Sequence, residues 1–217
     1  TISSSGGTNA AIHGRKNGFK NATSDTEKLL ANPEINSVAI VTRHNSHAKF
    51  VIQALDAGKH VFVEKPLALT LEELEDVQTA YANAGSCQLM VGFNRRFAPQ
   101  VKIMKELLEQ ISQPKCFIMV MNAGHIPADH WTQDLEIGGG RIVGEACHHI
   151  DLMRFLSGSP IVSVHAHCME EANSTSSAKD KVSINLGFKD GSIGTIHYFA
   201  NGGNSFSKER IEVFAGG

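Results

Sequence analysis

The stretch AGKHVFVEKPLALT, residues 57–70, decides how this chain folds. HVFV (60–63) is a short apolar run typical of a buried strand, and the proline that follows ends it because proline cannot donate in a central ladder. Gly58 suits the end of a preceding helix, and Thr70 begins a T-x-x-E capping box that predicts the next one. A strand between two helices is the repeating unit of a parallel α/β sheet.

The same pattern extends to both sides of this stretch. SVAIVT (37–42) and CQLMVGF (87–93) predict two further strands, and a helix is expected after the first of them. Ligands of parallel sheets bind at the carboxyl ends of the strands. The residues that follow the three strands are polar and are therefore candidates for a site: Thr42 to Asn45, Glu64 to Pro66, and Asn94 to Arg96.

The second half of the chain predicts a different architecture. After a helix at about 98–110, strands are expected at 115–123, 161–169 and 181–188, with a helix at about 142–156 and a polar loop at 171–180. The alternating pattern of 161–169 predicts that this strand is half-buried. The D-G pair in KDGS (189–192) indicates a hairpin, and KERIEVF begins one more strand. We therefore expect a truncated Rossmann-like α/β domain over 1–97 and a partial α+β domain with a largely antiparallel sheet over 98–217.

Length and composition exclude several classes. At roughly 150 residues per domain, 217 residues make about one and a half domains. With 41% hydrophobic and 19% charged residues, the chain can bury a core and is not disordered. A net charge of −2 argues against nucleic acid as the main partner, and no apolar run reaches about 18 residues, which argues against a membrane span. Four scattered cysteines without a CxxC pair, and no signal peptide, favour a cytoplasmic location.

Three motifs together resemble one family. They are GKHV-x-x-EKP-x-x-x-T, NRRF (94–97) and GGG-x7-H-x-x-D (138–151), and their combination is similar to the Gfo/Idh/MocA family of NAD(P)-dependent oxidoreductases. TRHNSH and GRIVGEACHHID are similar to its predicted dehydrogenases linked to polysaccharide biosynthesis. The resemblance implies hydride transfer between NAD(P) and a ring carbon of a sugar, nucleotide-sugar or cyclitol.

The resemblance implies two catalytic residues, Lys65 and His148. A lysine at a strand end can orient or deprotonate the reacting hydroxyl, although the dipeptide alone also fits a surface lysine paired with Glu64. An imidazole, which ordinarily titrates at about pH 6.5, suits proton transfer. Many relatives carry an Asp four residues before the histidine, where this chain has Gly144. Either Glu145 replaces that acid or Lys65 and His148 act without it.

Further positions follow from the same resemblance. Expected substrate-binding residues are Asn94, Arg95, Trp131, Glu145 and Asp151, and expected cofactor-binding residues are Ser4, Thr42, His44, Asn45, Glu64 and Lys65. The triple glycine at 138–140 permits a close approach of the backbone to a substrate or a sharp turn into the following helix. The G-x-G-x-x-G turn that holds a pyrophosphate is absent, so we expect a fragment truncated at both ends that binds NAD or NADP weakly or not at all.

The sequence also bears on metal binding, on assembly and on other possible functions of the chain. Paired histidines such as His165 and His167 do not form a recognisable zinc spacing, so no metal is expected. Relatives commonly assemble through the sheet domain, which implies a homo-oligomer. Two other functions remain open on this fold: a non-catalytic nucleotide sensor or scaffold, and an NAD-dependent glycoside hydrolase.

Overall fold

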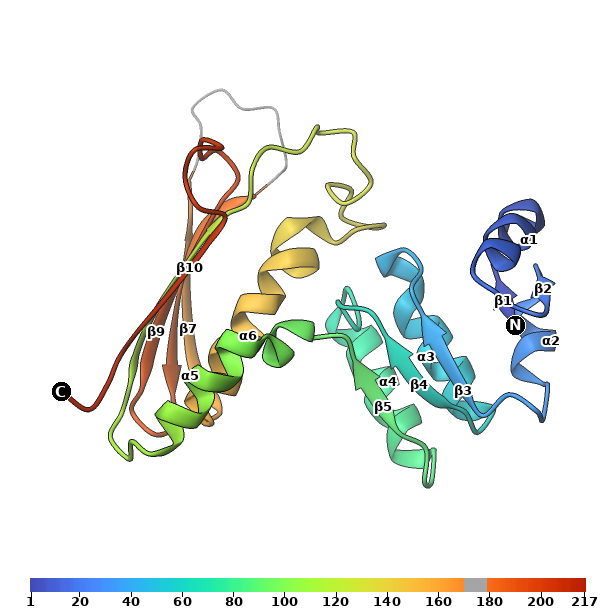
Figure 1. Cartoon of the computed structure of the whole chain (residues 1–217), viewed down its shortest axis with the longest axis horizontal. Helices are drawn as coiled ribbons and strands as arrows, with labels where there is room; N and C mark the ends of the chain where they lie inside the picture. Colours follow the sequence, from blue (N-terminus) through green and yellow to red (C-terminus); the bar gives the residue numbers. More distant parts are fainter. Residues whose placement is uncertain (170–178) are drawn as a thin grey trace. The chain divides into compact units, whose positions relative to one another are not determined.

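The computed structural model describes residues 1–169 and 179–217, and its chain forms two compact units. The first unit comprises Thr1–Thr42 and Ser46–Val91, and the second comprises Arg43–Asn45 and Gly92–Gly217. Each unit has its own apolar core. The elements keep the labels of Figure 1.

The first unit alternates strands and helices as the sequence predicts. Its elements are β1 (Ile2–Ser3), α1 (Gly7–Lys16), β2 (Ala22–Thr23), α2 (Thr26–Leu30), β3 (Ser37–Ile40), α3 (His47–Asp56), β4 (His60–Val63), α4 (Leu71–Asn83) and β5 (Leu89–Val91). Helix α4 begins at the predicted capping box, in which Thr70 and Glu73 hold each other's backbone N–H groups. Gly58 has a φ of +69° after α3, the left-handed conformation that glycine adopts at a helix end.

All strand pairs of the first unit are parallel among the described residues. β1 pairs with β2 in one sheet, and β3, β4 and β5 form a second sheet in that order. Val51 and Leu55 of α3 pack with Val61 and Val63 of β4 in the core. Because parallel strands share a direction, β3, β4 and β5 end at the same edge, which confirms the predicted parallel βαβ arrangement.

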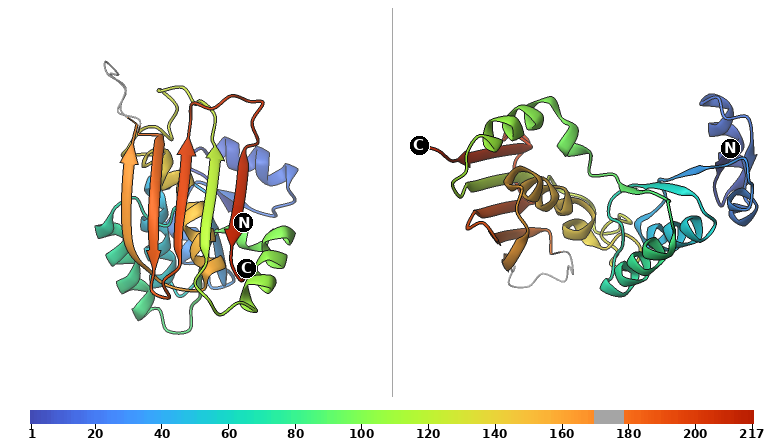
Figure 2. Two further views of the ribbon diagram at one scale, coloured as in Figure 1. Left: turned by 90° about the vertical axis from the view of Figure 1, so that its left-hand side faces the viewer. Right: turned by 90° about the horizontal axis from the view of Figure 1, so that it is seen from below.

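The second unit is a five-stranded sheet with two main helices. Its elements are η1 (His44–Ser46), which ends in the first unit, η2 (Asn94–Phe97), α5 (Pro99–Glu109), β6 (Cys116–Asn122), η3 (Ile142–Ala146), α6 (Cys147–Ser157), β7 (Ile161–Cys168), β8 (Lys181–Phe188), β9 (Ile193–Phe199) and β10 (Glu209–Phe214). The strand order is β10-β6-β9-β8-β7, seen face-on in Figure 2. Only the β6–β9 pair of these strands is parallel, which confirms a largely antiparallel sheet.

Helices α5 and α6 cover one face of this sheet (Figure 1). The period-two pattern of β8 places Val182, Ile184, Leu186 and Phe188 on the covered face, as the sequence predicts. They pack with Leu152 and the other apolar side chains of α6. The core of this unit therefore lies between α5, α6 and the inner face of the sheet.

Two elements of the second unit differ from expectation. The helix expected at about 142–156 begins as a π-helical turn, η3, and becomes α-helical only at Cys147. Strand β7 forms as predicted, but it is exposed along nearly its whole length rather than half-buried, with Val162 and Val164 both more than 60% exposed. β7 is the edge strand, and neither α5 nor α6 covers its end of the sheet. The loop expected at 171–180 falls mostly outside the described residues.

Candidate active site

Lys65 is the second residue after β4, at the carboxyl edge of the parallel sheet. The Lys65–Pro66 peptide bond is cis, a form that is common only before proline. Beside it, the fully buried imidazole of His47 makes a hydrogen bond of 2.7 Å to the carbonyl of Pro66 and one of 3.0 Å to the carbonyl of Thr42. His47 thus joins the ends of β3 and β4 and fixes the turn that carries Lys65.

The expected cofactor residues of the first unit lie at strand ends. The Ser4 hydroxyl follows β1 and donates to the carbonyl of Gly6 at 2.8 Å, while the Thr42 and Ser46 hydroxyls share a hydrogen bond of 2.6 Å after β3. Glu64 follows β4 and is half-buried. In open parallel sheets, ligands bind at this edge, where the strands end. The 217 residues contain no G-x-G-x-x-G turn for its pyrophosphate.

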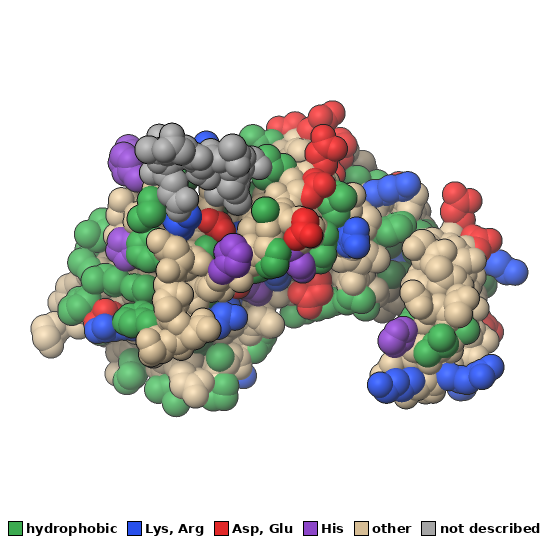
Figure 3. All heavy atoms as spheres, turned by 90° about the horizontal axis from the view of Figure 1, so that it is seen from above, with side chains coloured by type: hydrophobic (Ala, Val, Ile, Leu, Met, Phe, Trp, Pro, Cys, Tyr) green, Lys and Arg blue, Asp and Glu red, His purple; other side chains and the backbone are tan. Residues whose placement is uncertain are grey.

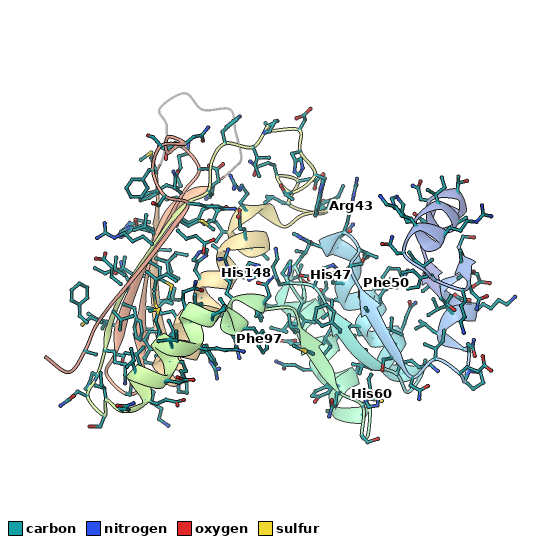
Figure 4. All side chains as sticks on the ribbon, in the orientation of Figure 1. Arg43, His47, Phe50, His60, Phe97 and His148 are labelled. Carbon is teal, nitrogen blue, oxygen red and sulfur yellow. The ribbon has the colours of Figure 1, made fainter. Side chains whose placement is uncertain are left out.

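His148 belongs to the second unit and is the second residue of α6 (Figure 4). Its side chain is buried, and its ring packs edge-on against Phe93 with centroids 6.2 Å apart. Gly144 lies four residues earlier on the same side of the helical segment, because side chains four residues apart in a helix are neighbours. A polar group next to Gly144 is therefore within about one turn of His148.

The short segment after β3, Arg43–Asn45, belongs to the second unit, as His148 does. Asn45 donates its backbone N–H to Ile137 at 3.1 Å, and Nδ1 of His44 lies 2.8 Å from the carbonyl oxygen of Gly138. The His44 ring stands edge-on to Trp131, with centroids 4.8 Å apart. The guanidinium of Arg43 lies 5.7 Å from the centre of the same indole. His44 and Trp131, which the sequence analysis assigned to different ligands, are thus in direct contact.

Glycine is required for different reasons at the two ends of the run 138–140: lack of space at the first and backbone conformation at the last. A Cβ on Gly138 would lie 2.4 Å from the Cα of Thr132 and 2.6 Å from the carbonyl oxygen of Trp131, so only glycine fits the close backbone approach. Gly139 and Gly140 have φ values of +73° and +74°, the left-handed conformation of a sharp turn. The predicted sharp turn is confirmed, the close approach at Gly138 is to the backbone of Trp131 and Thr132, and the approach of a substrate to this backbone stays a prediction.

Glu145 is engaged on the sheet side of its helix. Its carboxylate accepts a hydrogen bond from the buried Arg141 at 2.9 Å and another from the hydroxyl of Tyr198 on β9. Burial alone would raise the pKa of Glu145, but the hydrogen bonds from Tyr198 and Arg141 outweigh burial and lower it. Burial, followed by the hydrogen bond to Glu145, raises the pKa of Tyr198. The i, i+4 spacing of Arg141 and Glu145 was the sequence signal for this cluster.

Two other predicted substrate residues form ion pairs. Arg95 pairs with Glu209 on β10, and Asp151 accepts two hydrogen bonds from Arg96. The hydrogen bond to Asp151 is the largest effect on Arg96 and raises the pKa of its guanidinium. Asn94, next to them, is exposed. The structure therefore gives Arg95 and Asp151 a role in joining η2 to β10 and α6.

His149, adjacent to His148, is almost completely buried. Neither ring nitrogen has a hydrogen-bond partner among the described residues. Burial, followed by the positive charge of Arg95, lowers the pKa of His149 to about 4, against an ordinary value of 6.5. The ring is therefore neutral at physiological pH and belongs to the core.

No group of three or more His, Cys, Asp or Glu side chains in the part of the chain that the structure describes is arranged to hold a metal ion. None of its helices is both long and apolar enough to cross a membrane. On the face shown in Figure 3, several acidic side chains lie in a row, and Lys and Arg side chains are scattered singly or in small groups.

Comparison with known proteins places both halves of the chain. Residues 2–93 match the family model for the NAD-binding Rossmann fold of the Gfo/Idh/MocA oxidoreductases, and residues 104–215 match the model for a C-terminal domain of the same family. Myo-inositol 2-dehydrogenase of Thermotoga maritima is 29% identical over 92% of this chain and 60% of its own length. Levoglucosan dehydrogenase of Pseudarthrobacter phenanthrenivorans is 34% identical over 69% of this chain and 40% of its own.

Solved structures agree with the sequence matches. A levoglucosan dehydrogenase in complex with NADH and levoglucosan is 27% identical, with a TM-score of 0.87 over 99% of this chain and 61% of that one. The chain thus spans about 60% or less of the length of these relatives. Two family models that together match nearly every residue from 2 to 215 show that the chain belongs to the Gfo/Idh/MocA family of oxidoreductases.

Proposed function

We propose that the chain is the catalytic part of an NAD-dependent dehydrogenase that oxidises a ring hydroxyl of a sugar or cyclitol. The observation that carries the proposal is the presence of both proton-handling residues on well-defined elements: Lys65 on a turn fixed by His47, and His148 at the start of α6. Relatives named as inositol and levoglucosan dehydrogenases support this substrate class. Nucleotide-sugars belong to the same class by chemistry, and NADP is the alternative cofactor.

Oxidation of a secondary alcohol removes a hydride from carbon and a proton from oxygen, which leaves a ketone. Nicotinamide, when bound, accepts the hydride. Lys65 orients the hydroxyl with its ammonium group and His148 takes the proton on its imidazole. Thr42, Asn45, Glu64 and Ser4 are proposed to hold the ribose and nicotinamide, and Asn94 and Trp131 to contact the substrate.

The test is a cofactor-reduction assay with inositols, levoglucosan and other polyols. NAD is supplied at millimolar concentration, because without a G-x-G-x-x-G turn we propose that these 217 residues bind the dinucleotide weakly. Lys65→Met and His148→Asn should each lower kcat by about a hundredfold or more. The matched controls are Lys102→Met and His165→Asn, two exposed positions that should retain full activity. Circular dichroism melts check that both catalytic variants fold.

The outcomes separate the alternatives. Equal rates for Lys65→Met and the wild type would show that the site assignment is wrong. Dinucleotide binding without turnover on any polyol would favour the sensor or scaffold. Release of a chromogenic aglycone without net NADH would identify a glycoside hydrolase.

We further propose that the chain forms a homo-oligomer through its five-stranded sheet. Among the residues that the structure describes, no helix of the second unit covers one face of that sheet, and a row across this face places Phe214, Cys116 and Ile193 side by side, all exposed. Light scattering after size exclusion measures the oligomeric state. Ile193→Lys should dissociate the assembly, whereas Lys102→Glu on α5 should not, and a monomeric wild type would refute the proposal.

A further inference from the structure

The imidazoles of His165 and His167 lie on one face of the edge strand β7. Side chains two residues apart in a strand point to the same side, with Cβ atoms about 7 Å apart. The register identifies that side, because His167 lies opposite Ser183, whereas Ala166 lies opposite Ile184 of the core. Both imidazoles therefore belong to the face of the sheet that α5 and α6 do not cover, and both are exposed to solvent.

Other histidines of the chain are engaged by neighbouring groups. The two ring nitrogens of His47 lie 2.7 and 3.0 Å from backbone carbonyl oxygens, and Nδ1 of His130 lies 2.8 Å from the Thr132 hydroxyl. On the sheet face itself, Nδ1 of His197 lies 2.9 Å from the hydroxyl of a serine on β8. Within the described part of the chain, the side chains of His165 and His167 make no hydrogen bond, ion pair or ring contact.

Two adjacent, accessible imidazoles form a chelating group for a divalent transition-metal ion. Imidazole nitrogen suits Cu²⁺, Ni²⁺ and Zn²⁺, and binds zinc at about 2.0–2.1 Å. Once the first ring has bound, its tether to the second ring gives the second binding step a high effective concentration. No group of three or more metal-binding side chains exists in the described residues, so water would complete the coordination.

We propose that His165 and His167 together bind one divalent transition-metal ion, and that Cu²⁺ binds most tightly. A chelate of two histidines needs no further ligand from the sequence, so the lack of a zinc spacing does not exclude it. His148 belongs to α6, which covers the other face of the sheet. Metal binding at this pair therefore neither requires nor alters polyol oxidation.

Isothermal titration calorimetry with NiCl₂ tests the proposal on the 217-residue chain, without an affinity tag and after treatment with EDTA and dialysis. The Kd for Ni²⁺ should rise about tenfold or more in His165→Asn and in His167→Asn, because each variant keeps one imidazole and loses the chelate. His197→Asn is the matched control, since it removes another histidine of the same sheet face and should leave the Kd unchanged. Titration with CuSO₄ should give the same pattern at lower concentrations.

Two further measurements count the histidine ligands. Both rings have to be neutral to bind the ion, so well below pH 6.5 the affinity should fall about a hundredfold per pH unit, against about tenfold for one imidazole. The electron paramagnetic resonance spectrum of the Cu²⁺ complex should show coupling to two imidazole nitrogens in the wild type and to one in His167→Asn.

The outcomes are separable. Equal Ni²⁺ affinity in the wild type and in both β7 variants would overturn the proposal and show an adventitious ion only. A loss confined to His197→Asn would also overturn it, by placing the ligand on β9, and an equal loss in all three variants would replace the pair by a three-histidine site. A wild-type Cu²⁺ spectrum with one coupled nitrogen would show that the two rings do not share an ion.

Discussion

The guanidinium of Arg96 donates a hydrogen bond to each carboxylate oxygen of Asp151 and so joins the turn after β5 to helix α6. The Asp151 side chain is only 9% exposed and that of Arg96 is 34% exposed. The guanidinium also lies 5.4 Å from the centre of the Phe155 ring on the same helix. This partly buried pair, with two hydrogen bonds, ties η2 to the helix that carries His148.

Replacement of Asp151 by Asn should lower the free energy of unfolding by about 1–3 kcal/mol, because the charge-assisted hydrogen bonds to Arg96 weaken. Urea denaturation measures the change. A double-mutant cycle with Arg96→Gln should show that the two losses are not additive. The control is Arg210→Gln: its exposed pair with Glu212 should cost less than about 1 kcal/mol. Equal losses at the two pairs would contradict the prediction.

The local signals of the sequence predict most of the fold. Alternation in KVSINLGF, the Thr70 capping box and the glycine at 58 each report on contacts within a few residues, and each is confirmed. Strand β7 shows the limit of such signals. Its alternating pattern predicts a strand correctly, but whether a helix covers one face of that strand depends on elements distant in sequence.

In the candidate site, too, some residues are predictable from local motifs and others only from the fold. Motifs identify Lys65 and His148, yet nothing local indicates that His47 bridges Thr42 and Pro66, because those partners lie 5 and 19 residues away. The contact between His44 and Gly138 spans 94 residues and is likewise invisible to spacing rules. Hydrogen bonds that join separate elements require the fold before they can be recognised.

His149 should make the stability of the protein dependent on pH. Its pKa is about 4 in the folded state against 6.5 ordinarily, so below pH 6.5 the unfolded chain binds a proton that the folded chain does not. Stability is fully present above pH 6.5 and falls as the pH drops towards 4. At about 1.4 kcal/mol per pKa unit, the loss amounts to about 3 kcal/mol.

His149→Phe should remove this dependence, because phenylalanine has a similar size and does not titrate. Since neither ring nitrogen has a hydrogen-bond partner in the described part of the chain, the variant should be at least as stable as the wild type at pH 7. Thermal melts from pH 4 to pH 8 provide the measurement. His165→Asn, at an exposed position of β7, should leave the profile unchanged. A wild-type slope that persisted in His149→Phe would assign it to other groups.

Glu145 should be a stability residue. Its replacement by Ala leaves the buried guanidinium of Arg141 without a negative partner, which costs about 3–5 kcal/mol for a buried pair. Tyr198→Phe removes one hydrogen bond and should cost only about 1 kcal/mol, as measured by urea denaturation. Tyr81→Phe, at a position 46% exposed on α4, should have no effect. A Glu145→Ala variant as stable as the wild type would show that Arg141 is satisfied by backbone carbonyls alone.

Gly138 should tolerate no side chain, because the backbone itself occupies the space. A Cβ there would lie 2.4 Å from the Cα of Thr132, and the overlap has to be relieved by moving the chain that carries Trp131 and accepts the hydrogen bond of His44. We expect Gly138→Ala to lower the free energy of unfolding by about 1–3 kcal/mol and to shift the emission of Trp131. Gly203→Ala is the matched control: its nearest atom, Oγ of Ser205, lies at an ordinary 3.9 Å, so stability should change by less than about 0.5 kcal/mol. Were both alanines equally harmless, the close approach of Gly138 to Thr132 would not be what holds His44 in place.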